Sequence, residues 1–271
     1  MPEDKITTPE YLYHYTSIEA LALILQTRKI KLTRLDKVND PTEELSRDGK
    51  LGKYLFVTCW TSQEKEGVPF WYMYGHNKRG VRIGLPNNFI KTYKVREQFR
   101  REDGAVTTNG QVFDSIVSES ALLGSPFLLV NFSATHNKFF PVEYTDDPEL
   151  LRPPIFSEDD RGTLNVALGA LGKHKPEIWR FEQEWRFRLI FHPYGVCDIN
   201  PADASNVRHA IKTRKELDFD AYFLEISDTA FQQMEVILGP SCTPGDKIVA
   251  GALIDKYNPG VPLRPSDLLV R

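Results

Sequence analysis

Charged and apolar residues alternate along residues 184–191 more regularly than anywhere else in the second half of the chain. Glu184, Arg186 and Arg188 occupy alternate positions, and large apolar side chains fill the positions between them. Because successive side chains of a β-strand point to opposite faces, this period of two predicts a strand with one charged and one apolar face. Such a strand must lay its apolar face on a core, so we expect a β-sheet at the centre of the fold.

Short β-prone segments recur along the chain and predict further strands at residues 12–15, 29–33, 54–60, 80–85, 139–144, 219–226, 234–238 and 261–263. Apolar spacing and capping residues predict helices at residues 16–25, 70–74, 112–122, 159–172 and 244–257. No repeat or linker interrupts this series. The chain is therefore predicted to be a single mixed α+β domain over residues 1–271, with a central, mostly antiparallel β-sheet flanked by helices and a flexible segment at residues 1–10.

The overall charge gives the chain no general affinity for nucleic acid or for anionic membranes. Its 34 basic and 37 acidic residues leave a formal charge of -3. Cys59, Cys197 and Cys242 are too few and too scattered for a disulfide framework or a structural zinc site. The polar N-terminus lacks the apolar core of a secretory signal, and no apolar run is long enough to span a bilayer. A cytoplasmic protein is expected.

Several common catalytic motifs are missing. The sequence has no Gly-x-Gly-x-x-Gly after a strand, no Gly-x-x-x-x-Gly-Lys-Ser/Thr, no Gly-x-Ser-x-Gly and no His-Glu-x-x-His. The six histidines stand singly, and none is paired at the spacing of metal ligands on a helix. The usual dinucleotide and phosphate loops are thus excluded, and no metal is expected.

The first candidate motif is Tyr13-His14-Tyr15-Thr16-Ser17, which places an imidazole and hydroxyl groups beside the start of a predicted helix. The free N–H groups of a helix N-terminus attract anions, so this place suits a ribose or a phosphate. The alternative is structural: Thr16 or Ser17 caps the helix, His14 satisfies a backbone carbonyl, and the tyrosines pack.

The second candidate motif is Asn39-Asp40-Pro41-Thr42-Glu43, in which two acids and an amide flank a rigid proline on a predicted loop. Loops carry functional residues more often than cores do. The alternative is an ordinary Asx-turn that caps a short helix.

The third candidate motif is the pair Trp71 and Tyr74, three residues apart on one face of a predicted helix, where they could stack on nicotinamide or a base. The alternative is that they belong to the core. In the fourth motif, Glu182 and Glu184 share one strand face with Arg186. That face is either a solvated salt-bridge ladder or, inside a cleft, a place to stabilise a cation or act as a base.

Taken together, these motifs resemble a bacterial family catalogued as domain of unknown function 2971. The resemblance covers nearly the whole chain, from about Leu12 to Gly239. The matching segments are residues 12–17, residues 39–43, Trp71 with Tyr74, and residues 80–84, 179–186 and 236–239.

The order of the motifs is also similar to that of the ADP-ribosyltransferase superfamily, which includes toxins that modify DNA or RNA. This resemblance implies an ADP-ribosyltransferase-like fold, with His14 holding the ribose of NAD and Glu184 as the catalytic carboxylate on a late strand. The resemblance implies that Tyr15, or the helix that carries Trp71 and Tyr74, binds the nicotinamide ring. The hydroxyl groups of Thr16 and Ser17 and the start of their helix would bind the rest of NAD.

The same resemblance implies a function: transfer of ADP-ribose from NAD to a nucleic-acid or protein acceptor, in a toxin or phage-defence system that could include an antitoxin. The acceptor would be met by Asn39, Asp40, Glu43, Glu182 and Arg186. Two alternatives stay open. One is a non-catalytic nucleotide or nucleic-acid binding domain. The other is a magnesium-dependent hydrolase, which ranks last because the arginines would compete with a metal for the carboxylates.

Overall fold

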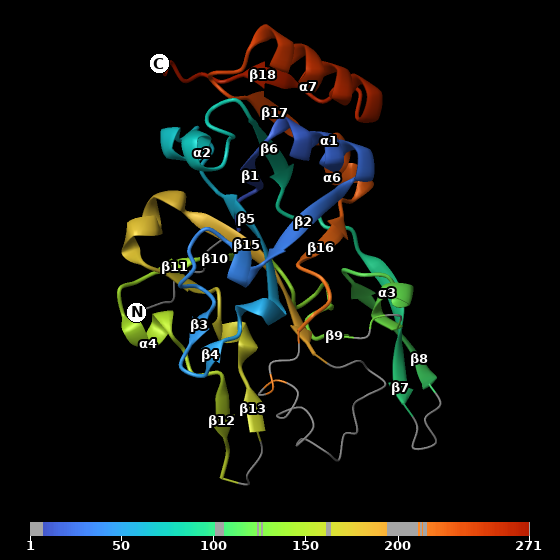
Figure 1. Cartoon of the computed structure of the whole chain (residues 1–271). Helices are drawn as coiled ribbons and strands as arrows, with labels where there is room; N and C mark the ends of the chain where they lie inside the picture. Colours follow the sequence, from blue (N-terminus) through green and yellow to red (C-terminus); the bar gives the residue numbers. More distant parts are fainter. Residues whose placement is uncertain are drawn as a thin grey trace, which may run out of the picture.

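The computed structural model shows a mixed α/β fold with few helices around a central, mostly antiparallel sheet (Figure 1). The structure describes residues 8–100, 106–123, 125, 127–160, 164–193, 211, 213 and 216–270. Within those residues the central sheet is built from β1 (Tyr11–Thr16), β2 (Lys29–Arg34), β5 (Leu55–Thr61), β6 (Val81–Pro86), β9 (Leu128–Leu129), β10 (Phe140–Pro141), β15 (Glu184–His192), β16 (Ala221–Glu225), β17 (Glu235–Leu238) and β18 (Leu263–Pro265).

Strand β5 lies at the branch point of this sheet. One of its edges pairs with β15 from Glu184↔Thr61 to Ile190↔Leu55. Its other edge is shared by two strands, because β1 pairs with it at Tyr13↔Thr61 and β2 pairs with it from Thr33↔Val57. Strands β1 and β2 therefore diverge from β5 and leave a fork beside residues 58–60.

The remaining strands extend the sheet away from the fork. The main path runs in the order β10, β15, β5, β1, β6, β17 and β18, while β16 pairs with β2 and β9 pairs with β15. Pairing is antiparallel throughout this sheet except between β17 and β18, which are parallel. The prediction of a central, mostly antiparallel sheet is confirmed.

Helices and smaller ribbons surround this sheet. The helices are α1 (Ile18–Thr27), α2 (Val68–Met73), α3 (Glu119–Leu123), α4 (Pro148–Leu151), α6 (Asp228–Gln232) and α7 (Pro244–Tyr257). The 3-10 turns are η1 (Leu35–Lys37), η2 (Gly52–Tyr54), η3 (Leu168–Ala170) and η4 (Glu177–Glu182). Separate two-stranded pairs are formed by β3 (Leu45–Ser46) with β4 (Gly49–Lys50), β7 (Tyr93–Arg100) with β8 (Val106–Ser115), β11 (Glu143–Tyr144) with β14 (His174–Lys175), and β12 (Phe156–Glu158) with β13 (Leu164–Val166).

Buried apolar side chains form two groups among the described residues. The larger group runs through the central sheet and includes Leu12, Phe56 and Trp185. The smaller group consists of Tyr15, Phe70 and Trp71, with three partly buried side chains packed against it. The larger group is the core of the fold, and the smaller group packs α2 against Tyr15 near the C-terminal end of β1.

The predicted strands and helices are largely found, with three corrections. The helix predicted at residues 112–122 is wrong over its first part, because residues 112–115 belong to β8 and only residues 119–122 are helical, in α3. Pairing with the polar strand β7 outweighs the helical spacing of its apolar residues.

The helix predicted at residues 159–172 is also wrong. The described part of this segment forms β13 and η3, and Gly172 has a φ of 69°, which a helix does not allow. Residues 161–163 lie outside the described residues. The strand predicted at residues 139–144 is divided into β10, which pairs with β15, and β11, which pairs with β14.

Two further expectations concern the N-terminal segment and membrane insertion. Most of the predicted flexible segment, residues 1–7, and Cys197 lie outside the described residues. A search of the described helices for one long and apolar enough to cross a membrane finds none.

Candidate functional site

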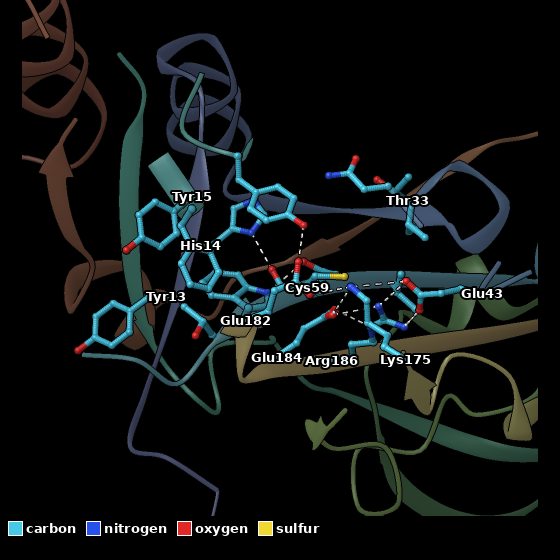
Figure 2. A pocket seen from close by; sticks show the side chains of 18 of the residues that line it. Tyr13, His14, Tyr15, Thr33, Glu43, Cys59, Lys175, Glu182, Glu184 and Arg186 are labelled. Carbon is cyan, nitrogen blue, oxygen red and sulfur yellow. Dashed lines mark hydrogen bonds and ion pairs between the residues drawn. The ribbon is translucent and has the colours of Figure 1, made fainter. Parts of the chain in front are cut away.

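A cavity of about 230 Å³ lies at the fork where β1 and β2 leave β5 (Figure 2). Its walls come from these three strands, from α2, from the loop after β2, and from β14, η4 and β15. Eight of the residues predicted as site residues line this one cavity: His14, Tyr15, Asn39, Tyr74, Glu43, Glu182, Glu184 and Arg186. Segments far apart in the sequence thus meet here.

The imidazole of His14 bridges the fork in the sheet. Its Nδ1 atom lies 2.8 Å from the carbonyl oxygen of Cys59 on β5. A carbonyl only accepts, so Nδ1 carries the proton. Burial lowers the pKa of His14, although this hydrogen bond opposes the shift. His14 is therefore neutral at pH 7, and its Nε2 atom is a hydrogen-bond acceptor.

The opposite wall of the cavity is a buried cluster of charges centred on Arg186, whose side chain is 1% exposed. Its Nε donates to Glu184 Oε1 at 2.5 Å, and its Nη2 donates to Glu184 Oε2 at 3.1 Å. Both Nη atoms also donate to the carboxylate of Glu43, which comes from the loop after β2. Arg186 is thus held between two carboxylates from distant parts of the chain.

Lys175 completes this cluster from β14. Its Nζ lies 2.6 Å from Glu182 Oε2, 3.1 Å from Glu184 Oε2 and 3.7 Å from Glu43 Oε1. Burial would lower the pKa of Lys175, but the three carboxylates outweigh it and raise that pKa. We call Glu43, Lys175, Glu182, Glu184 and Arg186 the charge cluster (Figure 2). With all five groups ionised, three carboxylates face two cations and leave one negative charge in excess.

The two neighbouring carboxylates Glu182 and Glu184 differ in their electrostatics. Burial alone would raise the pKa of Glu184, but the charges of Arg186 and Lys175 lower it to about 2. Burial raises the pKa of Glu182, and Lys175 offsets only part of that effect. Tyr74 donates to Glu182 Oε1 at 2.5 Å. Glu184 therefore stays ionised, whereas Glu182 is the carboxylate that can change its protonation.

The backbone around residue 183 explains how both carboxylates reach the cluster. Glu182 ends η4, Glu184 begins β15, and Gln183 between them is left-handed with a φ of 41°. The prediction that Glu182 belongs to the strand is therefore wrong. The interpretation of this face as a solvated ladder is wrong as well, since Glu184 and Arg186 are buried.

Four other residues of the predicted site do not line the cavity. Thr16 ends β1, and Ser17 caps α1 by accepting from the backbone N–H of Ala20 at 3.1 Å. Trp71 is fully buried, and its Nε1 donates to Glu66 at 2.9 Å. The side chains of Ser17 and Trp71 thus have structural partners.

Asp40 is the fourth of these residues. Its Oδ1 accepts from the backbone N–H of Thr42 at 2.9 Å and from the Thr42 hydroxyl at 2.7 Å, which makes an Asx-turn. This turn carries Asn39 and Glu43 to the cavity, so Asp40 shapes the loop that they occupy.

Lys175 and Cys59 line the cavity beside the predicted residues and were not predicted as site residues. Lys175 belongs to none of the four motifs, and no spacing pattern marks it. Cys59 lines the cavity, but burial and the charge of Glu184 raise the pKa of its thiol. His14 contacts the carbonyl of Cys59 and leaves the thiol without a base from that side chain. A cysteine nucleophile is therefore not supported.

The charge cluster also bears on metal binding. Over the described residues, no group of three or more His, Cys, Asp or Glu side chains is arranged to hold a metal ion. The oxygens of Glu43 and Glu184 already accept hydrogen bonds from Arg186. A divalent cation would have to compete with that guanidinium for the same oxygens.

Comparisons with protein-family models, with curated proteins and with solved structures found no match. The resemblances to domain of unknown function 2971 and to the ADP-ribosyltransferases stay predictions. The function rests on the geometry of the cavity.

Proposed function

We propose that this protein is an NAD-dependent ADP-ribosyltransferase that transfers ADP-ribose to a nucleic-acid or protein acceptor. The observation that carries this proposal is the charge cluster of three carboxylates and two cations, with one excess negative charge when all five are ionised, buried beside a cavity that is also lined by a neutral imidazole. Loss of nicotinamide develops positive charge on the ribose. A preorganised anion in a site shielded from water stabilises such a transition state.

The size of the cavity indicates which part of NAD it would hold. Its volume of about 230 Å³ lies below the roughly 300–1,000 Å³ of sites that enclose whole ligands. Nicotinamide and its ribose would occupy the cavity, beside Phe70 and Tyr74. The pyrophosphate would lie at the mouth, where the exposed side chains of Lys31 and Lys37 supply positive charge.

The proposed reaction uses the residues that line the cavity. The bond between C1′ of the ribose and the nicotinamide nitrogen breaks, and its electron pair leaves with neutral nicotinamide. The ionised Glu184 stabilises the resulting cation, while Nε2 of His14 accepts a hydrogen bond from a ribose hydroxyl. The acceptor oxygen or nitrogen then bonds to C1′ and loses its proton. Glu182 takes that proton because its pKa is raised by burial.

The test is nicotinamide release from NAD by the purified full chain, with and without nucleic acid or cell extract. We expect release by the wild type, and loss of release in Glu184→Gln and His14→Ala with the fold retained in circular dichroism. Glu177→Gln is the matched control, because this half-exposed acid of η4 lies away from the cavity and, among the described residues, forms its ion pair with Arg180. Absence of release from folded wild-type protein under every condition would reject the proposal.

One observation favours a second candidate, a non-catalytic nucleotide or nucleic-acid binding domain. Both carboxylate oxygens of Glu184 already accept hydrogen bonds from Arg186 and Lys175, as in a purely structural ion pair. A binding domain would bind NAD and leave it intact. An enzyme would let Glu184→Gln bind NAD but would lose cleavage.

A further inference from the structure

The wall of the cavity that carries Phe70 and Tyr74 is a short helix outside the main core. Helix α2 has only six residues, and an isolated helix of this length is not stable in water. Its buried residues pack with Tyr15, whose ring centroid lies 4.9 Å from that of Phe70 and 4.8 Å from that of Trp71. The position of the wall therefore depends on side-chain contacts made from other segments.

Glu66, just before α2, joins the helix to a distant segment of the chain. Its Oε2 accepts from Trp71 Nε1 at 2.9 Å and from the Ser266 hydroxyl at 2.6 Å. Its Oε1 accepts from the backbone N–H of Asp267 at 2.9 Å. Leu268 then packs against the small aromatic group of α2. In Figure 1, α2 accordingly lies below the red C-terminal end of the chain.

We propose that Glu66 is a positioning residue and that residues 66 and 266–268 form a clamp that holds α2 against the cavity. Through α2 the clamp places Tyr74, whose hydroxyl donates to Glu182 at 2.5 Å. Loosening the clamp moves the wall and weakens this hydrogen bond to Glu182, while the ion pairs within the charge cluster stay in place. The clamp thereby sets ligand affinity from outside the cavity, since neither Glu66 nor residues 266–268 line it.

The first test is amide hydrogen exchange, which needs no ligand. The N–H groups of Tyr74 and Gly75 donate to the carbonyl of Phe70 at 2.8 and 2.9 Å and report on the end of α2. Glu66→Ala should raise their exchange rates about tenfold, because hydrogen bonds to a charged group are lost. Amides of β15 should stay protected. Glu64→Ala is the matched control, since it removes an exposed acid of the same loop.

A second, more conservative variant tests the clamp even if Glu66→Ala does not fold. Ser266→Ala removes one hydroxyl donor to Glu66 and should raise the same exchange rates by a smaller factor. In the double variant the two effects should be less than additive, because both act on one carboxylate. Unchanged protection in Glu66→Ala and Ser266→Ala would overturn the clamp.

The second test measures ligand affinity, and its use of NAD rests on the proposed function. Glu66→Ala should raise KM for NAD about tenfold with a smaller change in kcat, since the wall that contacts the ligand moves while the ion pairs of Glu184 and Arg186 stay in place. Faster exchange together with no NAD cleavage by wild type would reject the transferase and keep the clamp as the support of α2. Normal KM despite faster exchange would overturn the positioning role of Glu66.

Discussion

The two walls of the cavity are built in different ways. The charge cluster comes from the loop after β2 and from β14, η4 and β15, and Glu43, Glu184 and Arg186 are almost completely buried. The opposite wall, α2, has six residues and packs on a small aromatic group apart from the main core. One wall is held by several buried ion pairs and the other by a few contacts at its edge.

This difference assigns two tasks of a binding site to different walls: one wall holds charges in fixed positions, and the other admits the ligand. Buried charges keep fixed positions because every displacement would expose an unpaired charge to a medium of low polarity. A short helix can shift at smaller cost, so it can admit and enclose a ligand. We expect changes in the charge cluster to act on stability first, and changes in α2 to act on binding.

The largest effect should come from Arg186→Met. This change leaves the buried carboxylates of Glu43 and Glu184 without their main cation. We expect a loss of about 3–5 kcal/mol in the free energy of unfolding, measured in urea. Arg180→Met, which removes a pair at the surface and one hydrogen bond to the carbonyl of Tyr144, is the control and should cost much less stability than Arg186→Met. Equal stability of the two variants would show that the charge cluster does not hold its wall.

The pH dependence of stability should distinguish Glu184 from Glu182. The folded pKa of Glu184, about 2, lies below its ordinary value of 4.5. Its contribution, on the order of 3 kcal/mol, is present above pH 4.5 and disappears as the pH falls toward 2. Unfolding curves of wild type and Glu184→Gln should therefore converge at low pH.

Glu182 should show the opposite trend. Its folded pKa is raised, so its contribution to stability is present below pH 4.5 and is lost as the pH rises through the folded pKa. Relative to Glu182→Gln, the wild type should gain stability as the pH falls. If the stability contributions of Glu182 and Glu184 changed in the same direction with pH, the opposite pKa shifts of the two carboxylates would be contradicted.

A smaller effect is expected for Tyr74→Phe, which removes the hydrogen bond to Glu182. We expect a loss of about 1.5 kcal/mol in stability and a further rise in the pKa of Glu182. Calorimetric unfolding and the pH profile of nicotinamide release measure the two quantities. Tyr72→Phe on the same helix is the control, because this side chain is exposed. A profile that does not move would mean that Glu182 does not titrate in the reaction.

The smallest effect is expected for Ser17→Ala. Loss of this N-cap should cost about 1 kcal/mol of stability. Nicotinamide release at a temperature where the variant is folded should match the wild type, since Ser17 does not line the cavity. A rise in KM for NAD would show instead that Ser17 contacts the ligand.

Much of the fold follows from short-range patterns in the sequence. The alternation at residues 184–191 predicted β15, and apolar spacing with proline near the start predicted α7. The patterns failed at β8, where the pairing with β7 decides the structure. Pairing of this kind is a contact between separate segments, and local periodicity does not contain it.

The candidate site was predicted in part for the same reason. The motifs near residues 14, 43, 74 and 184 contain residues that line the cavity. They could be recognised because each places polar or aromatic side chains beside a predicted strand, helix or turn. The sequence did not reveal Lys175, whose strand β14 pairs with β11 and lies beside the charge cluster. It also did not show that Glu182 and Glu184 differ in pKa, since burial and ion pairing set that difference.

The most direct measurement follows the ADP-ribose itself. Purified full-length chain is incubated with NAD labelled in its adenylate, together with nucleic acid or cell extract, and the label on macromolecules is quantified. We expect the wild type to transfer label, and Glu182→Gln and Glu184→Gln, folded and able to bind NAD, not to transfer it. Label that stays on intact NAD with the wild type would contradict the proposed transferase activity. Equal transfer by the wild type and both variants would show that Glu182 and Glu184 take no part in the reaction.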